Sequence, residues 1–277
     1  MRVRPGGPPP ARGLYHFHPR GTAGMNDPLR IRTNRIALYL TPGHECSYLP
    51  ARPARTLYVD PYATPDREVY QYLLDMGFRR SGDQIYRPQC PACTACVPVR
   101  IPVGQFRTRR AQRRCWRRNA PELQVIPRPP VFNSEHYALY RRYTATRHPG
   151  SGMADANLVG YLEFLTTRWC PTLFVELRRR EQLIAVAVTD VLPNALSAVY
   201  TFFDPDQSQD SPGVLAVLWQ IQEARRRGLE HLYLGYWIGA CQKMRYKDQY
   251  RPLEAWDGQC WRRYDRGDLV EERGTKN

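Results

Sequence analysis

The segment 241–252, CQKMRYKDQYRP, places two lysines, two arginines and two tyrosines directly after the apolar run HLYLGYWI. Lysine is rare in this chain, and Lys243 and Lys247 are two of only three lysines in it. A lysine supplies a compact positive charge, and the hydroxyl of Tyr246 between them can donate or accept a hydrogen bond. The pattern favours a site for an anionic or ester-bearing substrate; an exposed basic loop is the alternative.

Three cysteines have C-x-x-C-x-x-C spacing, and one more cysteine lies upstream of them. Together these residues could offer four thiolates to one structural zinc ion or iron–sulfur cluster: Cys46, Cys90, Cys93 and Cys96. The alternative is a set of reduced thiols packed as small apolar residues. The paired spacing of a zinc ribbon is absent, so the sequence leaves both interpretations open.

Positive charge is concentrated between residues 97 and 121, which carry eight arginines and no acidic residue. The whole chain has a formal charge of +15. Guanidinium groups bind phosphates in a bidentate manner, so a run of one sign favours contact with nucleic acid over a merely solvated surface. The arginines that we expect to bind RNA phosphates are Arg100, Arg109, Arg110, Arg113, Arg114 and Arg117.

Apolar spacing and helix caps predict an α+β chain. One helix with the stripe Val69, Tyr72, Leu73 and Met76, capped by Thr64, lies among short strands in a small cysteine-containing domain, residues 25–106. A basic junction, 107–125, leads to a second domain at 126–265. The predicted order of elements in this domain is helix, helix, three strands, helix, strand. This order matches a GNAT-like acyltransferase, which has a mixed sheet with flanking helices. Residues 1–24 are expected to be a disordered leader, with Met25 as an alternative start, and 266–277 a tail.

No apolar run approaches the roughly 20 residues of a membrane-spanning helix. Residues 1–24 contain no apolar core of a signal peptide, and the eight cysteines suit reduced thiols. We therefore expect a soluble, cytoplasmic protein that does not act at a membrane.

Five segments together resemble the bacterial aspartate/glutamate leucyltransferases, relatives of the arginyl-tRNA–protein transferases. They extend from about residue 46 to residue 256: CSYLPARPARTLYVDP, GFRRSGDQIYRPQCPACTACVPVRIPV, RRYTATRHPGSGM, VYTFFDP and LYLGYWIGACQKMRYKDQYRPLEAW. The resemblance implies that leucine passes from leucyl-tRNA to the α-amine of proteins that begin with Asp or Glu and marks them for N-end-rule degradation. It implies no dissociable cofactor.

For such a reaction, Asp204 at the end of VYTFFDP is the carboxylate expected to accept a hydrogen bond from the amine, unless it is only a turn residue before Pro205. Lys243 and Lys247 would contact the tRNA end or the acidic residue, and Tyr246 the ester. Arg87 and Arg100 are further candidates to bind the acidic residue, and Tyr236 and Trp237 to stack an adenine.

Three other functions compete with this one. An acetyltransferase would need a glycine-rich pyrophosphate turn, which the loop DPDQSQDSPG lacks. An arginyl-tRNA–protein transferase would share the chemistry and differ in the donor amino acid. A non-enzymatic, metal-containing RNA-binding module would explain the charge but would give the segment GYWI…KMRYK no role.

Overall fold

The computed structural model describes residues 36–63, 65–150 and 157–270. The expected leader 1–24, the proposed cap Thr64 and the last part of the expected tail lie outside these residues. None of the helices in the described ranges is long and apolar enough to cross a membrane.

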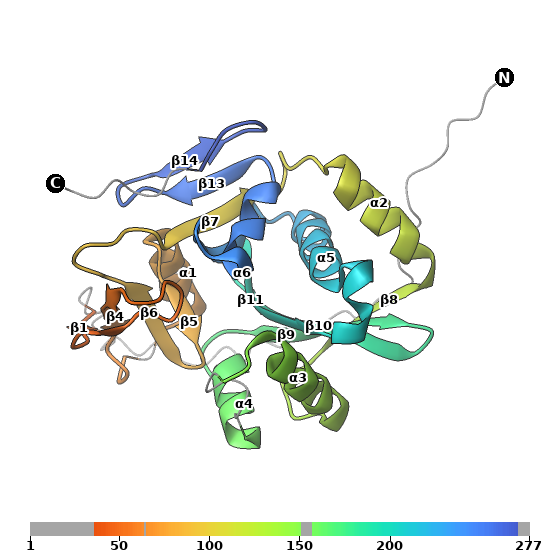
Figure 1. The fold of residues 1–277 in the computed structure, drawn as a ribbon, viewed down its shortest axis with the longest axis horizontal. Helices are drawn as coiled ribbons and strands as arrows, with labels where there is room; N and C mark the ends of the chain where they lie inside the picture. Colours follow the sequence, from red (N-terminus) through yellow and green to blue (C-terminus); the bar gives the residue numbers. More distant parts are fainter. Residues whose placement is uncertain (1–35, 64, 151–156, 271–277) are drawn as a thin grey trace, which may run out of the picture. The chain divides into compact units, whose positions relative to one another are not determined.

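A mixed sheet of eight strands forms the larger part of the fold (Figure 1). Across the sheet its strands are β14 (Trp261–Tyr264), β13 (Leu253–Trp256), β7 (Val97–Pro102), β12 (His231–Trp237), β11 (Ala195–Phe203), β10 (Gln182–Val191), β9 (Thr172–Arg179) and β8 (Leu123–Arg128). Every neighbouring pair is antiparallel except β11 and β12, which run parallel. The three consecutive strands that the sequence predicts within residues 173–205 are confirmed as β9, β10 and β11.

Helices cover both faces of this sheet. Along β10, Val186 and Val188 pack with α3 (Ser134–Arg147) and α4 (Leu158–Leu165), whereas Ala185 and Ala187 pack with α5 (Pro212–Arg226). Successive side chains of a strand point to opposite faces, so this alternation places α3 and α4 on one side and α5 on the other (Figure 1). α2 (Arg110–Asn119) packs beside α5 through Cys115, and η1 (Ala120–Glu122) follows it.

A smaller sheet has the order β1 (Leu38–Leu40), β4 (Thr56–Val59), β6 (Gln84–Pro88) and β5 (Arg79–Ser81). β2 (His44–Glu45) and β3 (Pro53–Ala54) form a separate ribbon. α1 (Arg67–Asp75) begins at Asp66, whose carboxylate accepts a hydrogen bond from the amide of Val69. Leu73 of the predicted stripe is buried, but Tyr72 and Met76 are exposed, so that part of the prediction is wrong; Tyr70 and Leu74 complete the buried face instead.

Strand β7 was assigned by sequence to the first expected domain, but in the structure it is part of the large sheet. It lies within residues 25–106, yet it pairs with β12 on one side and β13 on the other, in the middle of the large sheet. Its side chains Val97, Val99 and Ile101 are buried in the same core as Leu232 and Leu253. The proposed boundary at 106 therefore follows a strand that belongs structurally to the large sheet.

The two parallel strands separate soon after they meet. β11 and β12 pair only from Ala195–Ser197 against His231–Tyr233, although both strands continue beyond this point. On its other edge β12 carries a bulge between Tyr233 and Gly235, and Gly235 has a positive φ of 76°. We call the region where the strands diverge, around Val199 and Gly235, the splay.

Candidate active site

The guanidinium of Arg79 lies in the splay. Arg79 comes from β5 of the small sheet, donates a hydrogen bond from Nη2 to the carbonyl of Val199 (2.9 Å) and lies 5.8 Å from the ring centroid of Tyr236. A Cβ on Gly235 would collide with the guanidinium. The glycine therefore serves two purposes here, because it adopts the positive φ of the bulge and leaves room for the arginine.

Lys247 lies next to this arginine, inside the protein and not on its surface. It is 4% exposed, and its Nζ donates to the carbonyl of Tyr236 and to Sδ of Met244 (3.3 Å). Burial, and then the positive charge of Arg79, hold the pKa of Lys247 well below its ordinary value. The expectation that Lys247 is an accessible charge is therefore wrong, because its amine is buried.

Tyr246 forms the boundary between this interior and the solvent. Although 43% of the residue is exposed, its hydroxyl lies near Tyr143, and burial together with that neighbour raises the pKa of Tyr246 to about 12. The hydroxyl therefore stays protonated at any working pH and can donate a hydrogen bond. Tyr246 begins η3 (Tyr246–Gln249), which follows α6 (Gln242–Arg245).

Lys243 and the end of α3 meet at the outer side of the same site. Nζ of Lys243 lies 3.4 Å from Nδ1 of His148, which follows the last turn of α3. Partial burial, Lys243 and Arg147 lower the pKa of His148. The structure thus brings Tyr246, Lys243 and Lys247 together around the splay, with cations in excess.

Asp204 is placed as the turn residue before Pro205, which the sequence analysis left open as the alternative to an amine acceptor. Its carboxylate is nearly buried, accepts hydrogen bonds from Nη2 of Arg142 (2.7 Å) and from the amide of Asp206, and caps η2 (Pro205–Asp210). These contacts are those of a turn residue that fixes the connection between β11 and α5.

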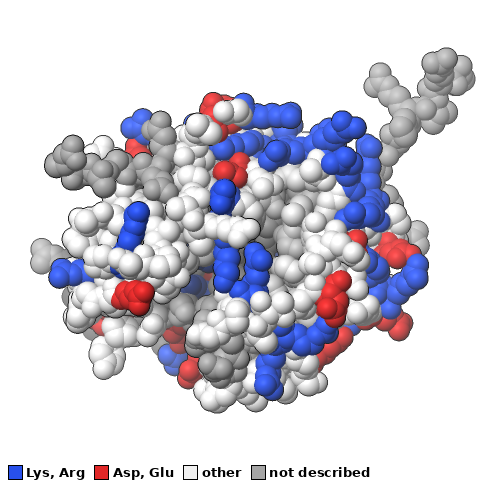
Figure 2. Space-filling model, in the orientation of Figure 1, with Lys and Arg blue, Asp and Glu red and all other residues white. Residues whose placement is uncertain are grey.

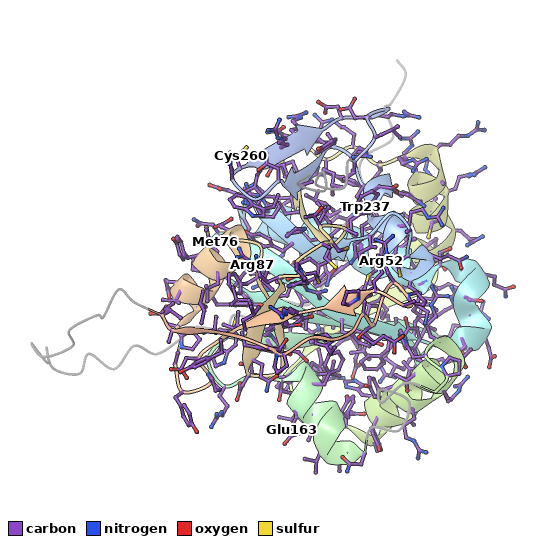
Figure 3. All side chains as sticks on the ribbon, turned by 60° about the vertical axis from the view of Figure 1, so that its left-hand side comes forward. Arg52, Met76, Arg87, Glu163, Trp237 and Cys260 are labelled. Carbon is purple, nitrogen blue, oxygen red and sulfur yellow. The ribbon has the colours of Figure 1, made fainter. Side chains whose placement is uncertain are left out.

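Four other predicted binding residues are engaged in intramolecular contacts. Arg100 pairs with Glu254 and Asp75 at 2.6 Å each, and Arg87 donates to the carbonyl of Met76 and lies over the ring of Phe78 (Figure 3). Tyr236 and Trp237 are buried. The large sheet is covered on both faces, so neither ring is free to stack on a base, and that prediction is wrong.

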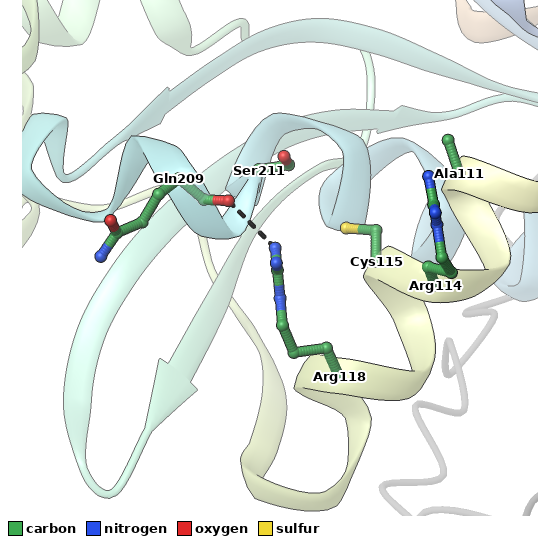
Figure 4. A pocket seen from close by; sticks show the side chains of 6 residues that line it. All are labelled: Ala111, Arg114, Cys115, Arg118, Gln209 and Ser211. Atoms are coloured by element: carbon green, nitrogen blue, oxygen red, sulfur yellow. Dashed lines mark hydrogen bonds between the residues drawn. The ribbon is translucent and has the colours of Figure 1, made fainter.

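The arginines of α2 lie on the surface. Gln112, Cys115 and Asn119 form its buried side, and the exposed side carries the predicted phosphate-binding residues Arg110, Arg113, Arg114 and Arg117, preceded by Arg109. Lys and Arg side chains gather over α2 in Figure 2. A pocket of about 540 Å³ opens beside the helix, where Arg118 donates to the carbonyl of Gln209 (Figure 4).

The four predicted metal ligands line one small pocket. Cys46, Cys90, Cys93 and Cys96 surround a space of about 80 Å³ next to Arg52, whose Nη1 contacts Sγ of Cys93. Burial, and then the other three thiols, raise the pKa of Cys96 to about 12. Four soft donors at one place suit zinc or an iron–sulfur cluster. As the side chains stand, however, no three His, Cys, Asp or Glu of the described ranges are arranged to hold a metal ion.

Comparison with known proteins identifies the family of this chain. Residues 44–114 match the family model "Arginine-tRNA-protein transferase, N terminus", and residues 135–257 match the corresponding C-terminus model. A protein of Halorhodospira halophila described as aspartate/glutamate leucyltransferase is 53% identical over 231 residues, which are 83% of this chain and 98% of that protein. The enzyme of the same description from Pseudomonas aeruginosa is 52% identical over 227 residues, 82% of this chain and 96% of the relative. The chain belongs to this family of bacterial aspartate/glutamate leucyltransferases.

Solved structures overlap with the leucyltransferase only in part. The C-terminal domain (DUF2156) of a protein described as a lysylphosphatidylglycerol synthetase from Agrobacterium fabrum aligns with a TM-score of 0.42 and 14% identity, over 61% of this chain and 51% of that chain. L-PGS from Bacillus licheniformis aligns with a TM-score of 0.38 and 12% identity, over 52% and 47%.

Local sequence patterns do not identify one residue of the candidate site. Arg79 stands beside Arg80 in the segment GFRRSG, and no cap, stripe or spacing distinguishes either of them. On a strand, neighbouring residues face opposite ways. Arg80 points to a buried carboxylate, Asp190, and Arg79 to the splay. The signal available in the sequence was this pair of adjacent arginines at the start of a short strand.

Proposed function

We propose that the enzyme transfers leucine from leucyl-tRNA to the α-amine of proteins that begin with Asp or Glu, and that the transfer takes place in the splay of a GNAT-like sheet. The observation that carries this proposal is the cluster of Arg79, Lys247 and Tyr246 at the divergence of β11 and β12. The aminoacyl end of the donor and the α-amine of the acceptor would meet at this divergence. The product would carry an N-terminal leucine and would enter N-end-rule degradation in the cytoplasm.

The reaction does not require a strong general base. The acceptor amine has a pKa of about 7.7–8.0, so part of it is neutral near pH 7.5. Its nitrogen attacks the ester carbon, the new amide C–N bond forms, and the C–O bond to the ribose breaks. One proton leaves the amine, and one is needed by the ribose oxygen. The hydroxyl of Tyr246, protonated because its pKa is raised to about 12, is suited to donate a hydrogen bond to that oxygen.

The donor RNA would be held mainly by charge. The exposed arginines of α2 form a one-sided basic surface, and phosphate contacts of this kind position an RNA without reading its bases. Lys243, which precedes Tyr246 by three residues and lies 3.4 Å from Nδ1 of His148, would contact the terminal phosphate or ribose. Arrangement of the two substrates would then provide most of the rate enhancement.

The cysteine pocket is proposed as a structural element. If its four thiols take up zinc or an iron–sulfur cluster, the group would hold the segment around Cys96 against Ile238 and Met244. The described side chains would have to move to enclose such a group, and no step of the transfer is assigned to it.

Transfer of radiolabelled leucine to reporter peptides tests the proposal. Leucyl-tRNA is offered with peptides that begin with Asp, Glu, Lys or Ala, and we expect label only on the first two. Transfer from arginyl-tRNA in place of leucyl-tRNA would keep the chemistry and change the donor, a result that the name of the matching family models makes worth testing. Absence of label with both donors would refute the proposal.

A further inference from the structure

Arg79 is a half-buried cation that has no carboxylate partner among the described residues. In the described part of the chain no carboxylate lies within ion-pair distance of it, and Nη2 to Val199 is the hydrogen bond that its guanidinium makes. The neighbouring Arg80, by contrast, is paired through two nitrogens with Asp190. Arg100 is paired with two carboxylates. A guanidinium has five N–H donors in a planar fork, so Nε and Nη1 of Arg79 are left for a partner that the described chain does not supply.

A second cation lies beside it. Lys247 and Arg79 both adjoin the Gly235–Tyr236 segment of β12, through the carbonyl and the ring of Tyr236 respectively. Besides Lys247, the titratable groups around Arg79 include the phenols Tyr86, Tyr48, Tyr236 and Tyr70. Those that act on Lys247 are Arg79 and the thiols of Cys241 and Cys96. Two adjacent cations among neutral groups are electrostatically unfavourable until an anion joins them.

We propose that Arg79, with Lys247 beside it, receives the side-chain carboxylate of the acceptor's N-terminal aspartate or glutamate. The inference rests on the proposed function and identifies the residue that selects the acceptor. The planar fork of an arginine matches a carboxylate in two parallel hydrogen bonds, which a neutral amide cannot reproduce. The proposal replaces the sequence-based candidates Arg87 and Arg100, which are engaged elsewhere.

The geometry favours a side-chain carboxylate over an RNA phosphate. The guanidinium lies in the splay, packed against Gly235 and near the ring of Tyr236, and apart from the exposed arginines of α2. A carboxylate on one or two methylene groups can extend into such a site, whereas a phosphodiester remains attached to a ribose on either side. Tyr246 lies close by, so the α-amine of the same residue would remain near the position proposed for the ester.

Charge and shape can be separated with isosteric peptides. Peptides that begin with Asn and Gln have the size of the Asp and Glu peptides without the charge. We measure kcat/KM for leucine transfer to all four, and separately the binding of dye-labelled Asp and Asn peptides in the absence of tRNA. The variants are Arg79→Gln, which removes the charge, and Arg79→Lys, which keeps the charge without the fork. The matched control is Arg67→Gln, whose residue forms an exposed ion pair with Glu68 on α1.

We expect Arg79→Gln to reduce transfer to the Asp and Glu peptides on the order of 100-fold, because loss of one partner leaves the other charge buried and unpaired. Transfer to the Asn and Gln peptides should change little, so the preference for acidic residues collapses. Arg79→Lys should fall between the two, and Arg67→Gln should match the parent enzyme. If Arg79→Gln fails to fold, Gly235→Ala provides a second test, because its methyl group would displace an unchanged Arg79.

Two outcomes would overturn the inference. One is an Arg79→Gln enzyme that folds and keeps the full preference for Asp over Asn. The other is a loss of leucyl-tRNA affinity with that preference intact, which would assign the site to a phosphate. Failure of the proposed transfer is distinguishable from both. The protein could transfer no leucine and still bind the Asp peptide more tightly than the Asn peptide, with Arg79→Gln abolishing the difference. This result would support the acceptor site and refute the assigned reaction. Equal binding of the two peptides would refute the acceptor site.

Discussion

The pair Arg80–Asp190 allows a quantitative test of how the small sheet is attached to the large one. Nε and Nη2 of Arg80 each donate to one oxygen of Asp190 at 2.6 Å, and both side chains are fully buried. Thr172 donates to the same carboxylate at 2.7 Å. The substitution Asp190→Asn keeps the shape but turns one acceptor into a donor and leaves the guanidinium without a counter-charge.

The expected cost is large. Removing one partner of a buried ion pair destabilises a protein by about 3–5 kcal/mol. For a chain of this size, that corresponds to a fall in Tm on the order of 10 °C. Arg79 is the neighbour of Arg80 on β5, so a displaced strand should also reduce leucine transfer. Urea denaturation followed by tryptophan fluorescence, with the transfer assay on the same preparation, measures both effects.

A matched control is available in an exposed pair of the same region. Arg168 pairs with Asp83 at 2.9 Å, but its side chain is 91% exposed. Exposed pairs contribute about 0–1 kcal/mol, so Arg168→Ala should change stability little. Replacing both buried partners with apolar residues, as in Arg80→Met with Asp190→Leu, should recover much of the stability. A destabilisation of less than about 1 kcal/mol in Asp190→Asn would refute the reasoning.

Three further outcomes are expected. Tyr246→Phe should lower kcat by about 10- to 100-fold with little change in KM or stability, measured by single-turnover transfer with Tyr72→Phe as the control. Because the pKa of Tyr246 is raised to about 12, its hydroxyl should stay protonated, and any loss of activity up to about pH 10 should be the same in the parent and in Tyr246→Phe. The variants Arg110→Gln, Arg114→Gln and Arg117→Gln should weaken leucyl-tRNA binding. The slope of log K against log salt concentration should become less steep by roughly 0.7–0.9 for each phosphate that is no longer neutralised, as measured by filter binding at several salt concentrations. Burial lowers the pKa of His136 in the folded protein, so as the pH falls the histidine is protonated in the unfolded chain before it is protonated in the folded one. The free energy of unfolding should therefore fall as the pH drops below about 6.5. His136→Asn should remove this part of the pH dependence, measured in urea melts at about pH 7.5 and 5.5.

Local signals in the sequence predicted the elements well. Asn133 caps α3 by accepting hydrogen bonds from the amides of Glu135 and His136. Ser211 and Pro212 mark the start of α5, and the apolar run after Gly228 forms β12. Caps, prolines and apolar spacing act between residues that are near in sequence, so one sequence is enough to read them.

Long-range pairing could not be predicted in the same way. Arg79 and Val199 are 120 residues apart, and no local pattern relates them. The apolar run of β7 fits a strand of either sheet, and its partners β12 and β13 follow much later in the chain. Tyr236 and Trp237 were expected to stack on a base, because an aromatic residue has the same local pattern whether it faces a ligand or the core. Whether these two rings are exposed depends on the elements that pack on both faces of the sheet, which the local sequence does not reveal.

The central position of β7 has a consequence for how the enzyme is made. The strand leaves the ribosome before either of its neighbours in the sheet, so both of its edges stay open until β12 and then β13 have been synthesised. Until Trp256 is in place, a nascent chain holds an unpaired, strongly apolar strand that chaperones and proteases can recognise. Interrupted synthesis should therefore yield fragments that are removed, and not partial enzymes that bind tRNA without transferring its amino acid.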